Sequence, residues 1–429
     1  MYTFFLMLVE LFKFHNLHWF VVFIIFIYLR WAIVYFHALK YRPVVCENKP
    51  FFSSVIIPVV DESEELFCSV LEKITEQEPD ELIVVINGPE NKPLEKICQQ
   101  TSEQCAAKGK RTDVKWLWTE TPGKRNAIRL GVEAMSVQSD ICILVDSDTL
   151  WSDHMLENLL MPFSADEKNG GVTSRQHIYK PDRSLVTMFA SVLEEVRAEG
   201  TMKAMSATGK VGCLPGRTIA FRSEIVRKVM PEFLHESFLG IHKEVSDDRS
   251  LTNLTLKQGY KTVMQDTAVV YTDAPVTWKK FFRQQLRWAE GSQYNNLYMT
   301  PWMIKNAKLM CFIFWTDMIM PFMLMSVYLS NIICFILRLM GRFYSFLVYP
   351  FPLPVTVLLI IIGSVFGFGS RNIRIMKSLP LYYIFLFPII VLVLSLFMAP
   401  IRILGLMRCA DGLPWGTREL TVQTKEGQQ

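Results

Sequence analysis

The sequence lacks paired cysteines and has few acidic residues in its last third. Its nine cysteines are scattered over the chain without one CxxC pair. It therefore offers no typical zinc site and no disulfide framework, and it suits a reducing, cytosolic environment. Between Asp317 and Asp411 there is no acidic residue. Blocks of basic residues interleaved with aromatics are also missing, which argues against a nucleic-acid partner despite the net charge of +4.

Hydrophobic residues make up 51% of the chain, and they gather at its two ends. The run from Leu17 to Phe36 has about the twenty residues that a bilayer requires. The start of the chain lacks the basic residues and the small-residue cleavage site of a signal peptide, so we expect an uncleaved anchor. Arg30 lies inside this run and should face protein or the membrane interface. Lys40 and Arg42 follow it, which predicts a cytoplasmic central domain.

Three further apolar segments follow the central domain: Met310–Leu337, Phe346–Phe368 and Leu379–Pro400. Three crossings would place the C-terminal tail outside the cell, although basic residues flank the last two segments. One segment is therefore expected to be interfacial or broken, with "YPFPLP" at Tyr349–Pro354 or the Asp317/Pro321 pair as the interruption. The early "FFLMLVELFKF" is too short to span and is expected to be interfacial. The chain should be a multi-pass protein of the plasma membrane whose number of crossings stays open.

The central domain alternates short apolar runs with helical patterns, which is typical of an α/β fold with a largely parallel sheet. Four runs predict strands, namely "SSVIIPVVDE", "ELIVVINGP", "VKWLWTE" and "DICILVDSDT". Each ends in polar residues, and ligands of open α/β sheets bind at the carboxyl ends of strands. The residues expected along that edge are Asp61, Asn87, Glu120, Asp146 and Asp148.

The stretch "LVDSDT" places Asp146 and Asp148 at one strand end, on the same side because side chains alternate with a period of two. Carboxylates of this kind suit Mg²⁺ or Mn²⁺, with phosphate oxygens completing the coordination. A plain strand-terminating turn, in which Asp and Ser are common, explains the same residues.

Two other charged motifs flank predicted helices. In "TPGKRNAIRL" a glycine turn precedes Lys124 and Arg125, and cations at a helix start form an anion site suited to a diphosphate. An ordinary turn before a surface helix is the alternative. In "HKEVSDDRSL" Asp247 and Asp248 precede an amphipathic helix. One of them could act as a general base, or both could simply cap the helix.

The segment "RQQLRW" stands immediately before the apolar C-terminal part. Helical spacing puts Gln284, Arg287 and Trp288 on one face. An indole stacks on a sugar ring, and Gln and Arg donate to hydroxyl or phosphate oxygens. Membrane anchoring explains the tryptophan but not the clustering of the three side chains.

These motifs together resemble those of processive family 2 glycosyltransferases, the group of cellulose, chitin and hyaluronan synthases. The resemblance rests on Asp146–Asp148 (DxD), Ser246–Asp248 (the acidic motif) and Gln284–Trp288 (QxxRW). The C-terminal "WGTR", formed by Trp415, Gly416, Thr417 and Arg418, further resembles the tail of hyaluronan-type synthases. The stretches "SSVIIPVVDE", "VGCLPGRTIAFR", "HKEVSDDRSLTNLTLK" and "RQQLRWAEGSQYNN" resemble synthases of capsular polysaccharide. The likeness runs over nearly the whole chain.

The resemblance implies a GT-A type nucleotide-sugar-binding domain inserted between transmembrane and interfacial helices. It implies that Asp146 and Asp148 hold a UDP–metal unit and that Asp248, beside Asp247, is the catalytic base. The other residues implied to bind the nucleotide sugar are Asp61, Asn87, Lys124, Arg125, Gln284, Arg287 and Trp288. The residues implied to bind the acceptor are Cys213, Leu214, Pro215, Gly216, Arg217 and Trp288. One departure is that many family members have Asp-Asp-Gly where this chain has Ile86-Asn87-Gly88, which removes an acidic contact to uridine.

The implied reaction is inverting transfer that builds a polymer of alternating glucose and glucuronic acid from UDP-glucose and UDP-glucuronate. A glucuronate carboxylate needs a cation, and Arg175, Lys210 and Arg217 are candidates. The implied partners are both donors, the growing polysaccharide and the lipid bilayer, with the oligomeric state left open. The implied parts are an anchor region (1–45), the transferase domain (46–277), interfacial helices (278–308), a membrane channel (309–404) and a tail (405–429).

Three alternatives remain. A hyaluronan synthase would use UDP-GlcNAc with UDP-glucuronate. A non-processive enzyme would transfer to a lipid phosphate carrier, although such enzymes usually lack QxxRW. A non-catalytic exporter or scaffold is disfavoured, because both acidic motifs and the Lys124–Arg125 pair are intact.

Overall fold

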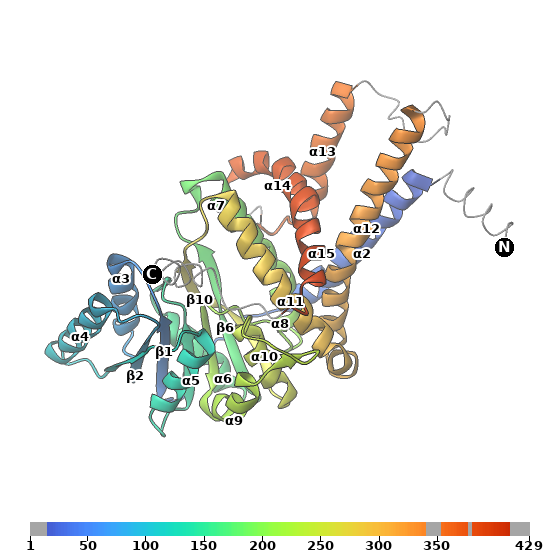
Figure 1. Ribbon diagram of the computed structural model, residues 1–429. Helices are drawn as coiled ribbons and strands as arrows, with labels where there is room; N and C mark the ends of the chain where they lie inside the picture. The colour runs from blue at the N-terminus through green and yellow to red at the C-terminus, as the bar shows by residue number, and fades with distance from the viewer. Residues whose placement is uncertain (1–14, 340–352, 376–379, 412–429) are drawn as a thin grey trace, which may run out of the picture.

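The computed structural model describes residues 15–339, 353–375 and 380–411. A mixed α/β domain occupies one side of the molecule, and long helices project from the other (Figure 1). The predicted interfacial helix in residues 1–14 and most of the Tyr349–Pro354 stretch lie outside the described residues. The same holds for the whole predicted tail motif, which comprises Trp415, Gly416, Thr417 and Arg418.

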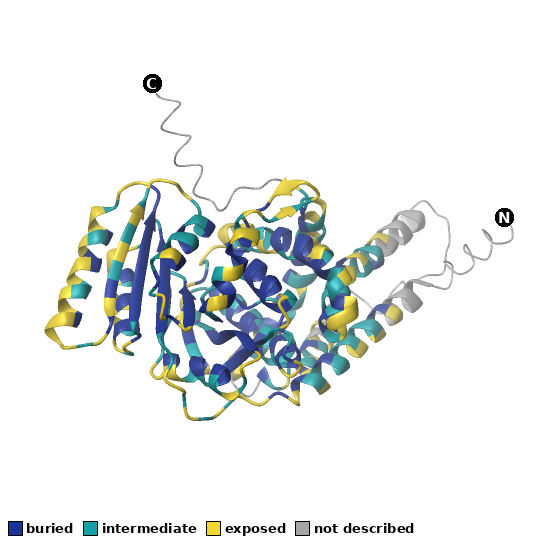
Figure 2. Cartoon of the chain, turned by 90° about the horizontal axis from the view of Figure 1, so that it is seen from below, coloured by how far each residue is buried: buried dark blue, intermediate teal, exposed yellow. Residues whose placement is uncertain are grey.

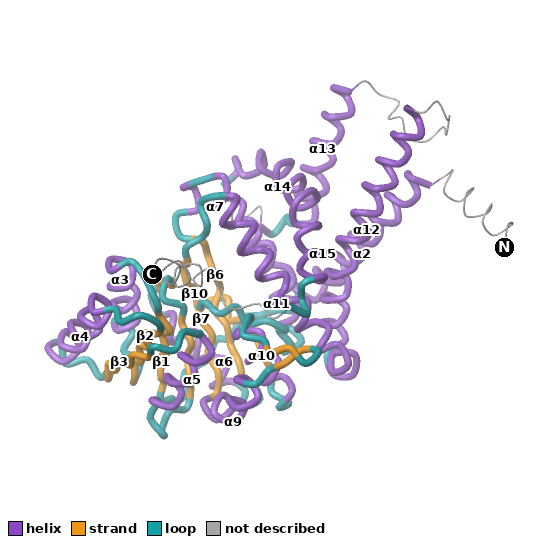
Figure 3. The backbone as a smooth tube through the Cα atoms, viewed as in Figure 1, coloured by secondary structure: helices purple, strands orange, loops and turns teal. Residues whose placement is uncertain are grey.

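The four predicted strands are present as β1 (Ser53–Val59), β2 (Glu81–Asn87), β3 (Asp113–Thr119) and β4 (Ile141–Val145). Four more complete an eight-stranded sheet: β5 (Thr149–Trp151), β6 (Asn169–Ile178), β7 (Thr218–Arg222) and β10 (Lys261–Thr272). The order is β3-β2-β1-β4-β7-β6-β10-β5. β3, β2, β1 and β4 are mutually parallel, whereas β7 and β5 run against their neighbours. The prediction of a largely parallel sheet is therefore confirmed, with a mixed second half. Figure 3 shows the strands in orange among the helices of this domain.

Helices cover both faces of the sheet. The elements of this domain are α3 (Glu64–Thr75), α4 (Lys92–Ala107), α5 (Lys124–Ala134), α6 (Met155–Ala165), α7 (Leu185–Arg197), α8 (Lys203–Ser206), α9 (Ser223–Leu234), α10 (Asp247–Lys257), the short η1 (Pro181–Arg183) and η2 (Ala198–Met202), and a hairpin of β8 (Ser237–Phe238) and β9 (Ile241–His242). Every residue of β1, β2 and β4 is buried because each strand has a core on both faces (Figure 2). The edge strand β3 alternates in exposure instead.

One of the two cores extends into the projecting helices. It joins Ile56 of β1 and Ile128 of α5 to Val34 of α2 (His15–Ala38), Met299 of α11 (Trp278–Asn306) and Ile313 of α12 (Lys308–Leu339). The α/β domain and these helices therefore share apolar contacts, and the domain is not attached by a linker alone.

The N-terminal anchor and α12 are also held together by an ion pair. Arg30 of α2 lies 2.5 Å from the carboxylate of Asp317 and donates to the hydroxyl of Thr316 at 3.0 Å. Arg30 thus faces protein, as its position inside an apolar run predicted. α12 is continuous through Asp317 and Pro321, so of the two suspected interruptions this pair is excluded. A charged side chain inside an apolar helix is tolerated here because it has a partner on the neighbouring helix.

The C-terminal apolar part is built from α13 (Leu353–Arg371), η4 (Leu381–Leu386), α14 (Phe387–Val393), η5 (Leu394–Met398) and α15 (Ala399–Met407). Within the described ranges, Lys308–Leu329 and Leu381–Met407 are long and apolar enough to cross a membrane. The last stretch ends at Met407, whereas the sequence predicted Pro400. Large apolar side chains such as Phe366 and Phe385 are exposed on these helices, as lipid-facing residues are.

α15 packs on α11 at a very close approach. A Cβ added to Gly405 would lie 2.6 Å from the Cβ of Ala289, 3.0 Å from its carbonyl carbon and 3.1 Å from the amide nitrogen of Glu290. Two of these atoms are backbone and cannot rotate away. Gly405 therefore sets the distance between the last helix and the helix that carries "RQQLRW".

We expect Gly405→Val to destabilise the detergent-solubilised protein by about 1–3 kcal/mol, because the added side chain must push α15 away from the α11 backbone. Thermal unfolding of the purified variant measures this. Gly363→Val is the matched control, because a Cβ at Gly363 of α13 meets no atom within 4 Å. Equal stability of the two variants would contradict the close packing of α11 and α15.

Candidate active site

The carboxyl ends of the parallel strands carry the predicted polar residues. Asp146 follows the last residue of β4, and its amide donates to the carbonyl of Arg217 at 3.0 Å. The amide of Thr149 closes the next turn by donating to the carbonyl of Asp146. This turn holds Asp146, Ser147 and Asp148 beside the loop that precedes β7.

Lys124 joins two of the sequence motifs. Its ammonium nitrogen lies 2.7 Å from Oδ1 of Asp146 and 3.0 Å from Oδ2 of Asp247. Lys124 is the first residue of α5, and Gly123 before it has a φ of 137°, a conformation that favours glycine. Burial disfavours the charged amine, but the carboxylates of Asp146 and Asp247 outweigh it and raise the pKa of Lys124 above its ordinary value.

Asp247 and Asp248 differ in environment although they are adjacent. Burial works to raise the pKa of Asp247, but Lys124 holds it below its usual range. The pKa of Asp248 is raised, first by burial and then by the negative charge of Asp247. One carboxylate is thus bound to a cation, while the other is a stronger base than an exposed aspartate.

The loop Cys213–Arg217 lies against Asp248. The amide of Gly216 and the thiol of Cys213 donate to Oδ2 of Asp248 at 3.3 and 3.8 Å. The amide of Leu214 donates to the hydroxyl of Thr252 at 3.1 Å, which ties the loop to α10. A Cβ at Gly216 would lie 3.6 Å from the Lys124 nitrogen and 3.4 Å from the Asp248 Cβ. The absence of a side chain there leaves the backbone close to both groups.

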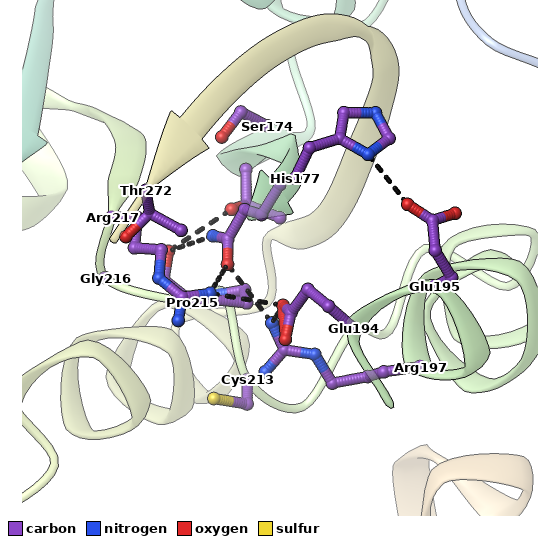
Figure 4. A network of polar contacts seen from close by, with 12 residues as sticks. Ser174, His177, Glu194, Glu195, Arg197, Cys213, Pro215, Gly216, Arg217 and Thr272 are labelled. Atoms are coloured by element: carbon purple, nitrogen blue, oxygen red, sulfur yellow. Dashed lines mark hydrogen bonds and ion pairs between the residues drawn. The ribbon is translucent and has the colours of Figure 1, made fainter. Parts of the chain in front are cut away.

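Pro215 anchors the other side of this loop. Its carbonyl accepts from the amide of Gln176 on β6 at 3.2 Å and from the hydroxyl of Thr173 at 3.4 Å (Figure 4). The loop is therefore fixed between α10 and the sheet.

Asp146 and Asp148 supply a donor set that fits a divalent metal ion. Burial and the neighbouring charge of Asp146 raise the pKa of Asp148 to about 6, as expected for two carboxylates that lie close together in a partly buried site. In the described part of the chain, no group of three or more His, Cys, Asp or Glu side chains converges. Two carboxylates suit Mg²⁺ or Mn²⁺ when a diphosphate provides further oxygen ligands.

Arg125 does not face this site, which corrects the prediction that it contacts phosphate. Its guanidinium is buried and lies 2.7 Å from the Glu236 carboxylate, and it also donates to the Ser250 hydroxyl at 2.9 Å and to the Val245 carbonyl at 3.1 Å. A further bond goes to the carbonyl of Phe233. Successive helix residues point about 100° apart, so Lys124 reaches the site while Arg125 holds the segment that leads to Asp247.

Asn87 is likewise turned inward, and Asp61 is not. Asn87 is buried, its amide donates to the carbonyl of Val59 at 3.0 Å and its oxygen accepts from the amide of Gly123 at 3.4 Å. It therefore positions the turn before Lys124, whereas the resemblance implied that it binds the nucleotide sugar. Asp61 and Glu120 lie exposed just beyond β1 and β3.

The "RQQLRW" segment lies on α11 beside this site. The Trp288 side chain is 39% exposed, and the guanidinium carbon of Arg217 lies 5.8 Å from the centre of its ring. Gln284 and Arg287 are partly buried on the same helix. Because Arg217 follows Gly216 directly, Trp288 and Asp248 contact adjacent residues of one short loop.

Of the three cations predicted as candidates to bind a sugar carboxylate, Arg175 and Lys210 have other partners. Arg175 is surrounded by the carboxylates of Glu195, Glu199 and Asp266. Lys210 lies 5.5 Å over the ring of Trp302, away from the Asp248 loop. Sequence reasoning also missed Gln176, Glu194 and Arg197, which contact Arg217 or each other and belong to no recognisable motif.

A family model described as "Glycosyltransferase like family 2" matches residues 50–291. The chain is 31% identical over 166 residues to hyaluronan synthase of Streptococcus pyogenes, covering 39% of this chain and 39% of that protein. It is 26% identical over 243 residues to an N-acetylglucosaminyltransferase of Azorhizobium caulinodans, covering 56% and 59%, and 26% identical over 184 residues to human hyaluronan synthase 3, covering 43% and 33%. The chain thus spans between a third and three fifths of the length of these relatives.

Among solved structures, the chain is similar to a mannosyltransferase from Pyrobaculum calidifontis in complex with GDP-Man and Mn2+. The TM-score is 0.59 at 15% identity, and the match covers 94% of this chain and 100% of that one. At this identity the likeness supports the fold alone.

Proposed function

Because this chain belongs to glycosyltransferase family 2 and has a GT-A-like fold, we propose that it is a processive, inverting transferase of the plasma membrane with a cytoplasmic catalytic domain. One observation carries the proposal. Lys124 connects the DxD carboxylate Asp146 to Asp247 of the acidic motif, and the Gly216–Arg217 loop connects Asp248 to Trp288 of QxxRW. Four motifs that are distant in sequence thus meet around one loop.

The donor end of the site is formed by Asp146, Asp148 and Lys124. The two carboxylates would hold Mg²⁺ or Mn²⁺, which when bound neutralises charge on the departing nucleoside diphosphate. The ammonium of Lys124 lies beside Asp146 and offers a fixed positive charge to the same phosphates. Asp61, exposed just beyond β1, would contact the nucleotide.

The acceptor end is formed by Asp248 and Trp288. An acceptor hydroxyl loses its proton to the Asp248 carboxylate as its oxygen forms a bond to the anomeric carbon of the donor. The bond from that carbon to the diphosphate breaks on the opposite side, and the electron pair leaves with the nucleotide. The raised pKa of Asp248 favours this proton transfer. Trp288 provides an exposed indole face on which the terminal sugar can stack.

The arrangement of the helices supports coupling between synthesis and the membrane. α11 carries Gln284, Arg287 and Trp288, and after one residue it is followed by α12, whose first part is apolar enough to span. A growing chain held at Trp288 would therefore start at the membrane boundary. We assign residues 46–277 to catalysis, 278–308 to the interface and 309–404 to a channel. The motif of Trp415, Gly416, Thr417 and Arg418 stays a predicted part of the tail.

For the donors we propose UDP-glucose and UDP-glucuronate, which the likeness to capsular polysaccharide synthases supports. The relatives named hyaluronan synthase favour a second candidate, UDP-GlcNAc with UDP-glucuronate. In both cases one donor is neutral and the other carries a carboxylate.

A donor screen separates the candidates. We expect the purified protein with Mg²⁺ or Mn²⁺ to form high-molecular-weight polymer only when UDP-glucuronate and one neutral UDP-sugar are both present. Digestion of the product by linkage-specific hydrolases identifies the neutral sugar. Polymer from UDP-GlcNAc and UDP-glucuronate alone would establish the second candidate, and single-sugar products on a lipid phosphate would contradict processive transfer.

We expect Asp248→Asn to lower the rate of sugar transfer by about a hundred- to ten-thousandfold, because the amide cannot accept the acceptor's proton. UDP release in the presence of acceptor measures the rate, and calorimetry measures donor binding, which should persist. Asp113→Asn is the matched control, since Asp113 is exposed and pairs only with Lys115 among the described residues. Transfer by Asp248→Asn at the wild-type rate would refute the assignment of the base.

We expect Trp288→Ala to abolish long polymer while the protein stays in the membrane fraction, because an aromatic contact worth about 1.5–3 kcal/mol is lost at the acceptor end. Gel filtration of the product measures chain length. Trp116→Ala is the control, because Trp116 on β3 is 38% exposed and remote from the loop. If Trp288 is only an anchor, membrane extraction will change and chain length will not.

A further inference from the structure

Two arginines share one carboxylate beside the Cys213–Arg217 loop (Figure 4). Nη1 of Arg217 donates to Oε1 of Gln176 at 2.7 Å and to Oε1 of Glu194 at 3.3 Å. Nη2 of Arg197 donates to the same oxygen of Gln176 at 3.2 Å and also to Oε1 of Glu194. The two guanidinium groups are thus brought together by one glutamate and one glutamine.

The charges of this cluster do not balance. Arg197 and Arg217 carry two positive charges, whereas Glu194 carries one negative charge and Gln176 none. The neighbouring Glu195 points away, to Arg175 and His177. The carboxylate of Asp148 is near enough to Arg217 for the arginine to oppose the rise of its pKa, but no ion pair joins these two side chains within the described residues. A further anion beside the two partly buried guanidinium groups is therefore still favourable.

Both arginines also retain hydrogen-bonding capacity. Within residues 15–339, 353–375 and 380–411, each uses a single terminal nitrogen as a side-chain hydrogen-bond donor. The Arg197 side chain is 36% exposed, compared with 13% for Arg217 and 10% for Glu194. Arg197 is therefore the more accessible of the two arginine side chains, whereas those of Arg217 and Glu194 are more deeply buried.

The arginine pair lies on the acceptor side of the base. Arg217 is covalently next to Gly216, whose amide contacts Asp248, and its guanidinium lies over the ring of Trp288. Burial and Asp248 raise the pKa of the Cys213 thiol to about 12, and the positive charge of Arg197 is near enough to oppose them. The two cations are therefore close to the loop that contacts both Asp248 and Trp288.

The backbone at Arg197 is unusual as well. Arg197 is the last residue of α7, and the chain continues as a single π-helical turn, η2, from Ala198 to Met202. Such turns widen a helix by one residue and occur frequently at functional sites. Here the wider turn follows directly after the exposed arginine.

We propose that Arg197 and Arg217 form a subsite for the carboxylate of a uronic acid unit at the acceptor end of the growing chain. The inference rests on the proposed function, because it requires a polymer in which acidic and neutral sugars alternate. Guanidinium groups bind carboxylates through paired N–H donors, so a uronate on Trp288 supplies the missing negative charge. Arg175 cannot serve, since three carboxylates already surround it.

Two single-addition assays test the subsite. An oligosaccharide ending in glucuronate is extended with the neutral UDP-sugar alone, and one ending in the neutral sugar is extended with UDP-glucuronate alone. We expect Arg197→Gln to lower the ratio of kcat/KM for the first reaction to that for the second by about ten- to a hundredfold, as loss of a charge-assisted contact predicts. Arg197→Lys, which keeps the charge, should recover part of the ratio.

Lys210→Gln is the matched control, because it removes a cation that lies by Trp302 outside the cluster, and it should leave the ratio unchanged. If Arg197→Gln lowers kcat/KM of both reactions by the same factor, Arg197 has a structural role and the subsite proposal is wrong. If it lowers kcat/KM of the second reaction alone, Arg197 recognises the donor and the subsite proposal is also wrong. Wild-type protein that extends only neutral-ended acceptors would also overturn the subsite but leave the transferase assignment intact, whereas absence of transfer from every UDP-sugar would refute the proposed function itself.

Discussion

The site depends on one partly buried cation, the ammonium of Lys124, that two carboxylates share. Lys124 lies between Asp146, at the end of β4, and Asp247, at the start of α10. Without it, Asp146, Asp148, Asp247 and Asp248 would gather like charges in a partly buried space, which is strongly unfavourable. The positive charge of Lys124 allows the end of β4 and the start of α10 to lie side by side. The lysine thereby brings together the two acidic motifs, which are about a hundred residues apart.

A second cation, the buried guanidinium of Arg125, keeps Lys124 in position. Arg125 ties the start of α5 to the segment before α10 through Glu236, Val245 and Ser250. Asn87 fixes the preceding turn through Val59 and Gly123. All these partners lie within the protein, so the backbone at Lys124 is fixed in position. Two adjacent residues therefore have different roles. Lys124 contacts the carboxylates of Asp146 and Asp247, and Arg125 holds the segment that leads to Asp247 and Asp248.

The sequence predicted the elements that depend on apolar runs and on recognised motifs. β1 to β4 were found because cores on both faces make their sequences apolar, and the strand-end residues Asp61, Asn87 and Asp146 do lie along one edge. β6 was missed because its buried residues include Ser174, Arg175 and Gln176, whose polarity is matched by partners that only the fold brings near. The same limit explains why Arg125 and Asn87 were expected in the site and Arg197 was not. Direction and pairing of polar side chains follow from tertiary structure and not from spacing.

α11 contacts both the apolar helix α15 and the residues of the site. Its N-terminal half presents Trp288 to the Gly216–Arg217 loop, and the next residues, Ala289 and Glu290, are in van der Waals contact with Gly405 of α15. Gly291 lies so near Ser246 that a side chain there would collide with it. Within four residues, α11 therefore contacts the acceptor loop, the last apolar helix and the acidic motif. A shift of α15 would therefore be transmitted through α11 to Trp288 and to the segment before Asp248. The geometry around Trp288 thus depends partly on the packing of the apolar C-terminal helices.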